Sequence, residues 1–86
     1  MPYFVYLLEC RDKSYYCGFT HNLGQRLLAH NKGRGGRYTR SHRPVKLVYF
    51  EEKRTMKAAM RREREIKTFR RSRKTMMAKG FTGNKG

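Results

Sequence analysis

Three short runs of apolar residues, separated by polar segments, predict three β-strands. The runs cover residues 3–10, 15–20 and 45–52, and they are rich in aromatic and β-branched side chains. The four residues RDKS separate the first two runs. We therefore expect these two strands to form an antiparallel hairpin.

Polar residues that favour helix N-caps precede two segments of helical periodicity. Asn22 stands before residues 23–30, and Thr55 stands before residues 56–69. In both segments apolar residues recur at intervals of three or four, which is the spacing of one helix face. Because Asn and Thr side chains accept hydrogen bonds from the first helical amides, each is predicted to begin a helix.

The remaining segments carry weaker signals. Ser72 is a candidate cap for a short third helix through residue 77, and Gly80 is placed to end it. The segment KGRGGRYTRSHRP, residues 32–44, follows neither the strand period nor the helix period and is predicted to be a long basic loop. The final segment FTGNKG is expected to fray.

These elements predict a small single domain of the α+β class. Their order, β-β-α-β-α-α, gives a three-stranded antiparallel sheet flanked by helices over residues 1–78, followed by a basic, flexible tail at 79–86. The 86 residues contain no apolar run long enough to span a membrane and no secretory leader. Cys10 and Cys17 lack the spacing of a zinc site and the density of a disulfide framework. We expect a cytoplasmic protein with two reduced, packed thiols.

Lysine and arginine outnumber acidic residues by 22 to 6, which gives a formal net charge of +16. So large an excess repels itself in a compact fold and is normally compensated by a polyanion. An anionic membrane is a poorer match, because a membrane-surface helix would set aromatic anchors opposite its basic face, where this chain sets methionine and isoleucine. A basic surface that contacts only solvent is the other alternative. The charge favours nucleic acid as the partner.

A carboxylate interrupts the predicted core face of the second helix. At about 100° per residue, Glu63 lies on the apolar side, whereas Glu65 points to the opposite, arginine-rich side. A carboxylate on a buried face is costly unless it is paired or holds a cation. Glu63 is therefore either a metal ligand or the partner of an arginine beneath the sheet. The predicted core face of this helix consists of Met56, Ala59, Met60 and Ile66.

The hairpin and the first helix add further polar groups that point inward. Each strand of the hairpin carries a tyrosine, Tyr6 and Tyr16, and the leucine face of the first helix carries Arg26 and His30. Each of these is compatible with ordinary packing when taken alone. Together with an inward carboxylate on a very basic domain, they match a site that cleaves phosphodiesters. In such a site an arginine clamps the phosphate, and a phenol or imidazole takes the proton of the attacking water. Gly18, which has no side chain, would let the nucleic-acid strand come close to the protein backbone.

These residues stand in the order and at the separation of the GIY-YIG nuclease signature. FVYLLEC resembles the first half, with Tyr6 at its tyrosine, and YYCGFT resembles the second half, with Tyr16 at its tyrosine. QRLLAHN matches the helix arginine and its frequent histidine partner, and AAMRRE resembles the helix that carries the metal-binding glutamate. The resemblance covers residues 3–70, and the whole chain looks like the small stand-alone bacterial proteins of the UPF0213 group. It departs from the signature at positions without chemistry: Phe4, Val5 and Cys17.

The resemblance implies a GIY-YIG endonuclease-like fold and an enzyme that uses one divalent metal, Mg²⁺ or Mn²⁺, to hydrolyse DNA. By position, Glu63 would ligate the metal and Tyr6 would act as general base, for which Arg26 and the cation would have to lower its high ordinary pKa. Tyr16 would bond the phosphate or a metal-bound water, and Arg26 would stabilise charge on the scissile phosphate. His30 would assist the base or contact the nucleic-acid backbone.

The predicted basic loop is the candidate for binding the nucleic acid, and its side chains suit contacts with phosphates better than contacts with base edges. We therefore expect targeting by the structure of the DNA or by a partner protein. The alternative is a non-catalytic basic module that retains the nuclease fold. The candidate binding residues are Gly18, Lys32, Arg34, Arg37, Tyr38 and Arg40.

The two phenols can serve one phosphate only if they project from the same face of the sheet. Side chains alternate between faces along a strand, so Tyr6 and Leu8 must share a face with Tyr16 and Gly18. This arrangement places Leu8 near Gly18 rather than near Cys17.

Overall fold

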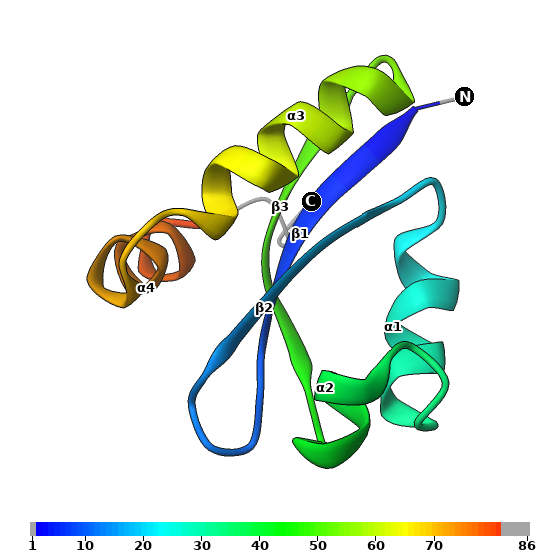
Figure 1. The fold of residues 1–86 in the computed structure, drawn as a ribbon, viewed down its shortest axis with the longest axis vertical. Helices are drawn as coiled ribbons and strands as arrows, with labels where there is room; N and C mark the ends of the chain where they lie inside the picture. The colour runs from blue at the N-terminus through cyan, green and yellow to red at the C-terminus, as the bar shows by residue number, and fades with distance from the viewer. Residues whose placement is uncertain (1, 82–86) are drawn as a thin grey trace.

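The computed structural model describes residues 2–81, which form a three-stranded antiparallel sheet flanked by helices (Figure 1). β1 (Tyr3–Glu9) lies between β2 (Tyr15–Thr20) and β3 (Lys46–Lys53), so β2 is an edge strand. The three predicted strands and the predicted fold class are confirmed. No helix within residues 2–81 is long and apolar enough to cross a membrane.

Both predicted helix caps are present. The Asn22 side chain accepts a hydrogen bond from the Gln25 amide at 3.0 Å, and the Thr55 side chain accepts one from the Ala58 amide at 3.1 Å. Ser72 is not a cap, because the last helix begins one residue earlier and Ser72 lies in its first turn. The helices are α1 (Leu23–Asn31), α2 (Arg37–Ser41), α3 (Met56–Lys67) and α4 (Arg71–Lys79).

The segment 32–44 is not simply a loop, because it contains the short helix α2. This helix packs against α1 and is anchored by Thr39, whose side chain is fully buried. Gly36, immediately before it, has a φ of +144°, which residues with a side chain rarely adopt. Five residues are too few to display a helical period, so the prediction of an irregular loop was wrong for 37–41.

Helices cover both faces of the sheet, with α1 and α3 on opposite sides of β2 (Figure 1). One face, which includes Val5 and Leu7, packs against α3. The other face, which includes Tyr6 and Leu8, packs against the leucines of α1. Both cysteines are buried and free, as predicted. The edge of β2 is therefore the place where groups from α1 and α3 can meet.

The core face of α3 is narrower than predicted. Ala59 is fully buried, but Met56 is 49% exposed and Met60 is 38% exposed, so their assignment to the core was wrong. Arg62 reaches over β3 and donates hydrogen bonds to both carboxylate oxygens of Glu51, at 2.8 to 3.1 Å. Ala59 and Ile66, both fully buried, set the packed face of α3 together with this ion pair, and the two methionines lie at the margin of that face.

The hairpin places both predicted site tyrosines on one face of the sheet, as required. Its register differs from the prediction by two residues: Tyr6 lies opposite Gly18, and Leu8 lies opposite Tyr16. The expectation that Leu8 lies near Gly18 was therefore wrong. A shift by two residues returns every side chain to its original face, so the shared face survives the error.

The predicted tail at 79–86 lies mostly outside the described residues. Lys79 ends α4 and Gly80 follows as its C-cap. The ring of Phe81 lies 5.4 Å from that of Tyr49 and 5.1 Å from that of Phe50, measured between centroids. The fraying expected of residues 82–86 falls outside the part of the chain that the structure describes.

Candidate active site

A groove of about 410 Å³ crosses the edge strand β2 between α1 and α3. The two tyrosines reach it from one face of the sheet, together with an arginine from α1, and a glutamate reaches it from α3 on the other face. They can meet because no further strand pairs with this edge of β2 in the described sheet. Four of the five predicted catalytic residues line this groove: Tyr6, Tyr16, Arg26 and Glu63.

Gly18 leaves the space that the phenol of Tyr6 occupies. A Cβ atom at this position would lie 2.5 Å from Tyr6 Oη and 2.7 Å from Tyr6 Cζ, closer than real Cβ contacts. A side chain here would displace the phenol from the groove. The structural need for glycine is thus the approach of Tyr6, and its predicted contact with a phosphate strand stays a prediction.

His30, the fifth predicted residue, is fully buried behind Tyr6. Its Nε2 lies 3.0 Å from Tyr6 Oη, and its Nδ1 lies 2.8 Å from Thr39 Oγ1. Thr39 Oγ1 donates its proton to the Gly36 carbonyl at 3.4 Å, so it accepts from His30 Nδ1. The network therefore assigns the tautomer with the proton on Nδ1, and the Tyr6 hydroxyl donates to Nε2.

Two residues that the sequence did not reveal hold His30 in place. Thr39 bonds its Nδ1, and Gly35 packs so closely that a Cβ there would overlap the imidazole ring. The double glycine at 35–36 was the available signal for a close approach. The threonine had no signal, because its hydrogen bond depends on how α2 packs against α1.

Burial sets the protonation states of the Tyr6–His30 pair. Desolvation, followed by the neighbouring Tyr16, raises the pKa of Tyr6 more than Arg26 lowers it. The net lowering expected from Arg26 is therefore not found in the protein alone. Desolvation, assisted by the charge of Arg26, lowers the pKa of His30 below 6.5. At neutral pH a protonated phenol thus faces a neutral imidazole.

Thermal stability is expected to fall as the pH drops below about 6.5. The pKa of His30 is lowered in the folded state, so below its ordinary value the unfolded chain binds more protons. The contribution to stability is complete above that ordinary value and is lost as pH falls toward the lowered one. The melting temperature of the parent chain should decrease as the pH is lowered. The control His21→Gln, which alters an exposed histidine, should behave in the same way. The curve of His30→Gln should be flatter, and a flat parent curve would contradict the assignment.

Glu63 lies at the margin of the groove with 20% of its side chain exposed. Its Oε2 is 3.4 Å from Nζ of Lys67, a half-exposed side chain one turn further along α3. Within residues 2–81 Glu63 forms its ion pair with Lys67 and with no arginine, and the neighbouring Arg62 binds Glu51. Glu63 therefore has a weak partner that a stronger cation could replace.

The donor set suits a hydrated hard cation. Within residues 2–81 no group of three or more His, Cys, Asp or Glu side chains is arranged to hold a metal. Among the described residues that line the groove, Glu63 is the single carboxylate. Mg²⁺ is commonly bound by one or two carboxylates and completes its shell with water and substrate phosphate oxygens. A lone carboxylate beside an open groove fits that mode of binding.

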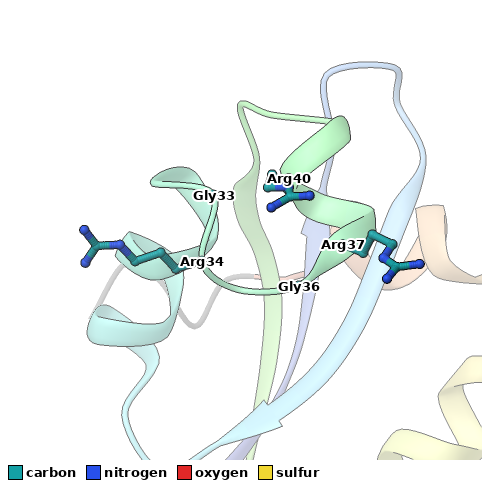
Figure 2. A pocket seen from close by; sticks show the side chains of 5 residues that line it. All are labelled: Gly33, Arg34, Gly36, Arg37 and Arg40. Carbon is teal, nitrogen blue, oxygen red and sulfur yellow. The ribbon is translucent and has the colours of Figure 1, made fainter.

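Most of the predicted nucleic-acid contacts lie on a separate basic surface formed by α2 and the residues just before it. Its guanidinium groups point in different directions (Figure 2), which suits several phosphates along a backbone better than one anion. Lys32 is exposed nearby, at the C-cap of α1. A hollow of about 310 Å³ on this surface is lined by Gly33, Arg34, Gly36, Arg37 and Arg40.

Tyr38, another predicted contact, braces α2 against the hairpin turn. Its ring stacks on that of His42 with 4.1 Å between centroids, and its hydroxyl donates to Ser14 Oγ at 2.5 Å. The side chain is still 41% exposed. The structure thus gives Tyr38 a packing role, and its contact with nucleic acid stays a prediction.

Comparison with known proteins relates this fold and groove to a family. The family model of the GIY-YIG catalytic domain matches residues 2–76. The chain is 48% identical over 75 residues to the UPF0213 protein SH2523 of Staphylococcus haemolyticus, which covers 87% of this chain and 92% of that protein. It is 44% identical over 80 residues to a UPF0213 protein of Haloquadratum walsbyi, and this match covers 93% of this chain and 90% of that protein.

Solved structures agree with the sequence comparison. The solution NMR structure of the UPF0213 protein BH0048 from Bacillus halodurans is 37% identical, with a TM-score of 0.57. That of the protein EF2693 from E. faecalis is 33% identical, with a TM-score of 0.61. Each of the two matches covers 92% of this chain and 84% of the chain in the solved structure. The chain therefore belongs to the GIY-YIG family and, within it, to the UPF0213 group.

Proposed function

We propose that this chain is a divalent-metal-dependent endonuclease that hydrolyses phosphodiester bonds in DNA, directed by the structure of the DNA rather than by its sequence. The observation that carries the proposal is the groove in which Tyr6, Tyr16, Arg26 and Glu63 meet, with His30 bonded behind Tyr6. Membership of the GIY-YIG family supports nuclease chemistry. The net charge of +16 supports a polyanionic substrate.

Three groups would bind and orient the phosphate. Glu63 would hold Mg²⁺ or Mn²⁺, which when bound polarises a phosphoryl oxygen and offsets the charge that develops on it. Arg26 lines the groove and can donate two parallel hydrogen bonds to phosphate oxygens. The ring of Tyr16 packs edge-on against His30, with 5.2 Å between centroids, and its hydroxyl would bond the phosphate.

Tyr6 and His30 would move the proton of the attacking water. With its raised pKa, Tyr6 is seldom ionised at neutral pH, but its hydroxyl already donates to the unprotonated Nε2 of His30. As the water oxygen bonds to phosphorus, the bond between phosphorus and the leaving oxygen of the strand breaks, and that oxygen takes a proton from solvent. The proton of the attacking water passes to Tyr6 Oη, and the phenol proton passes to Nε2. Thr39 Oγ1 accepts a hydrogen bond from the Nδ1–H group of His30 throughout, and this proton is not transferred. This path gives His30 the role of final proton acceptor.

Incubation with a panel of nucleic acids tests the proposal. Duplex, nicked, flapped, branched and single-stranded DNAs, with matched RNAs, are treated with Mg²⁺, Mn²⁺ or a chelator. We expect cleavage of at least one branched or single-stranded DNA when metal is present. Neither the chelated protein nor Glu63→Gln should cleave. Tight binding without cleavage of any substrate would instead identify a non-catalytic binding module.

Affinity for DNA is expected to fall steeply and linearly with salt on logarithmic axes. Each neutralised phosphate contributes about 0.9 to the slope on duplex DNA. Alanine at three exposed arginines in and just before α2 should flatten the slope and weaken binding to all sequences alike, as fluorescence anisotropy would measure. A control that removes the same charge from the α4 region should have a smaller effect. The test residues are Arg34, Arg37 and Arg40, and the control residues are Arg70, Arg71 and Lys79.

A loss confined to one DNA sequence would reveal base readout, which these contacts are not expected to provide. An affinity that does not respond to salt would contradict a phosphate backbone as the ligand.

A further inference from the structure

One end of the groove has no task in the proposed chemistry. It lies where β1 begins, β2 ends and α3 begins, at the same end of the sheet (Figure 1). The side chains there are mostly aromatic or apolar, in contrast to the charged groups around Arg26 and Glu63. They are Tyr3, Phe19, Thr20, His21 and Met56.

A stripe of thioethers on α3 leads from Glu63 to this end. Met60 and Met56 precede Glu63 by three and seven residues, so all three share one side of the helix. The two methionines are 38% and 49% exposed, although the packed face of α3 lies elsewhere. Met56 lies in the groove wall, roughly 10 Å along the helix axis from Glu63. A flexible, polarisable thioether suits contact with a flat π-face.

Aromatic rings form another part of the same wall. The rings of Tyr3 and His21 lie 6.3 Å apart between centroids, at an interplanar angle of 59°. Tyr3 is half-buried and His21 is exposed. Both rings and the Met56 thioether line the groove. Tyr3 also packs against the core that includes Val5 and Leu7, so it offers the groove only the part of its ring that this packing leaves open.

We infer that this end of the groove is a subsite for one unpaired nucleobase, adjacent to the phosphate at Arg26 and Glu63. The inference rests on the proposed function for the identity of the phosphate site. A nucleotide has the polarity of the groove, since an anionic phosphate lies at one end and a base with apolar faces at the other. The substrate class is thus a strand that is single-stranded or locally unpaired at the cleavage point.

A paired duplex cannot fill the subsite, because its base faces are stacked and must first be unstacked at a cost. A base in a single strand or a flap has both faces accessible to aromatic and thioether groups. A protein side chain is a poorer occupant, because the apolar wall continues directly into the phosphate end of a groove on a chain of net charge +16.

Equilibrium binding of Glu63→Gln, which should not cleave, tests the subsite without requiring turnover. The probes are a fluorescent single-stranded oligodeoxynucleotide of mixed sequence and a duplex of the same length, at matched salt. Adding Met56→Ala should weaken single-strand binding roughly tenfold, in the range seen when a base loses a stacking partner, and leave duplex binding unchanged. Met76→Ala removes a 73% exposed methionine from α4 and should change neither.

An abasic position moved along the single strand locates the base. One position should weaken binding about as much as Met56→Ala, and that loss should disappear in the Met56→Ala background because the two changes remove the same contact. Equal losses on single strand and duplex, or none on either, would overturn the subsite even if the parent chain cleaves DNA. A selective single-strand loss from a parent chain that cleaves nothing would retain the subsite and overturn the proposed function.

Discussion

Replacing Glu63 by glutamine is expected to abolish cleavage while DNA affinity stays equal or rises slightly. Glutamine keeps the size of the side chain but lacks the negative charge that a divalent cation requires. Metal stabilisation of charge on a phosphoryl group amounts to several kcal/mol, so the rate should fall by roughly a thousandfold or more. Affinity should not fall, because the change also removes a negative charge from a groove that receives phosphates. Single-turnover cleavage and anisotropy would measure the two effects.

Fold stability separates a metal ligand from a structural carboxylate. The partner of Glu63, Lys67, is half exposed at 3.4 Å, so breaking their pair should cost no more than about 1 kcal/mol. Glu65→Gln is the matched control, because Glu65 is 58% exposed and pairs with Arg62 away from the groove. It should leave cleavage unchanged. Full cleavage by well-folded Glu63→Gln would exclude a ligand role, and a lowered melting temperature with proportionate activity would make the residue structural.

Features fixed by neighbouring residues could be predicted from the sequence. Asn22 and Thr55 cap their helices through bonds to amides three residues away, so the signal and its effect lie within one turn. The strands follow from composition, and the groove residues follow from the spacing of the signature. That Tyr6 and Tyr16 share a face follows from the alternation of side chains along strands.

Features set by tertiary contacts could not be predicted in this way. The hairpin register depends on a turn in which the Cys10 amide donates to the Ser14 carbonyl and Lys13 takes a φ of +72°. Lysine is not a residue that indicates a left-handed backbone, so the predicted hairpin register differs from the observed one by two residues. The rotation of α3 likewise depends on the ion pair between Arg62 and Glu51, which joins separate elements.

The support of His30 was hidden for the same reason. Thr39 becomes a partner of the imidazole only when α2 folds back onto α1. The segment that carries the basic surface therefore also holds His30, the proposed proton acceptor, with Gly35 against the ring and Thr39 on its Nδ1. If the proposed function holds, one stretch of chain both binds the nucleic acid and supports the proton path, which the composition of 32–44 did not suggest.

Tyr6→Phe and His30→Gln are each expected to slow cleavage by about a hundredfold or more, the usual size of a general-base contribution. The double variant should be no slower than the worse single variant, because both changes interrupt one proton path. The parent rate should stay level from neutral pH down past 6.5 and then fall, since a protonated His30 cannot accept the phenol proton and its pKa is lowered by burial. His30→Gln should lack that acid limb.

Thr39→Val tests whether the tautomer of His30 matters. Valine keeps the volume of threonine but cannot accept a hydrogen bond from Nδ1 of His30. The imidazole can then carry its proton on Nε2, where it faces the Tyr6 hydroxyl. We expect a loss of roughly tenfold or more in rate, with a displaced acid limb, and recovery in Thr39→Ser. A purely structural role would lower the melting temperature and leave the pH profile of the folded fraction unmoved. Unchanged rates and profiles in Thr39→Val, or full activity in Tyr6→Phe, would contradict the proton path from water through Tyr6 to His30.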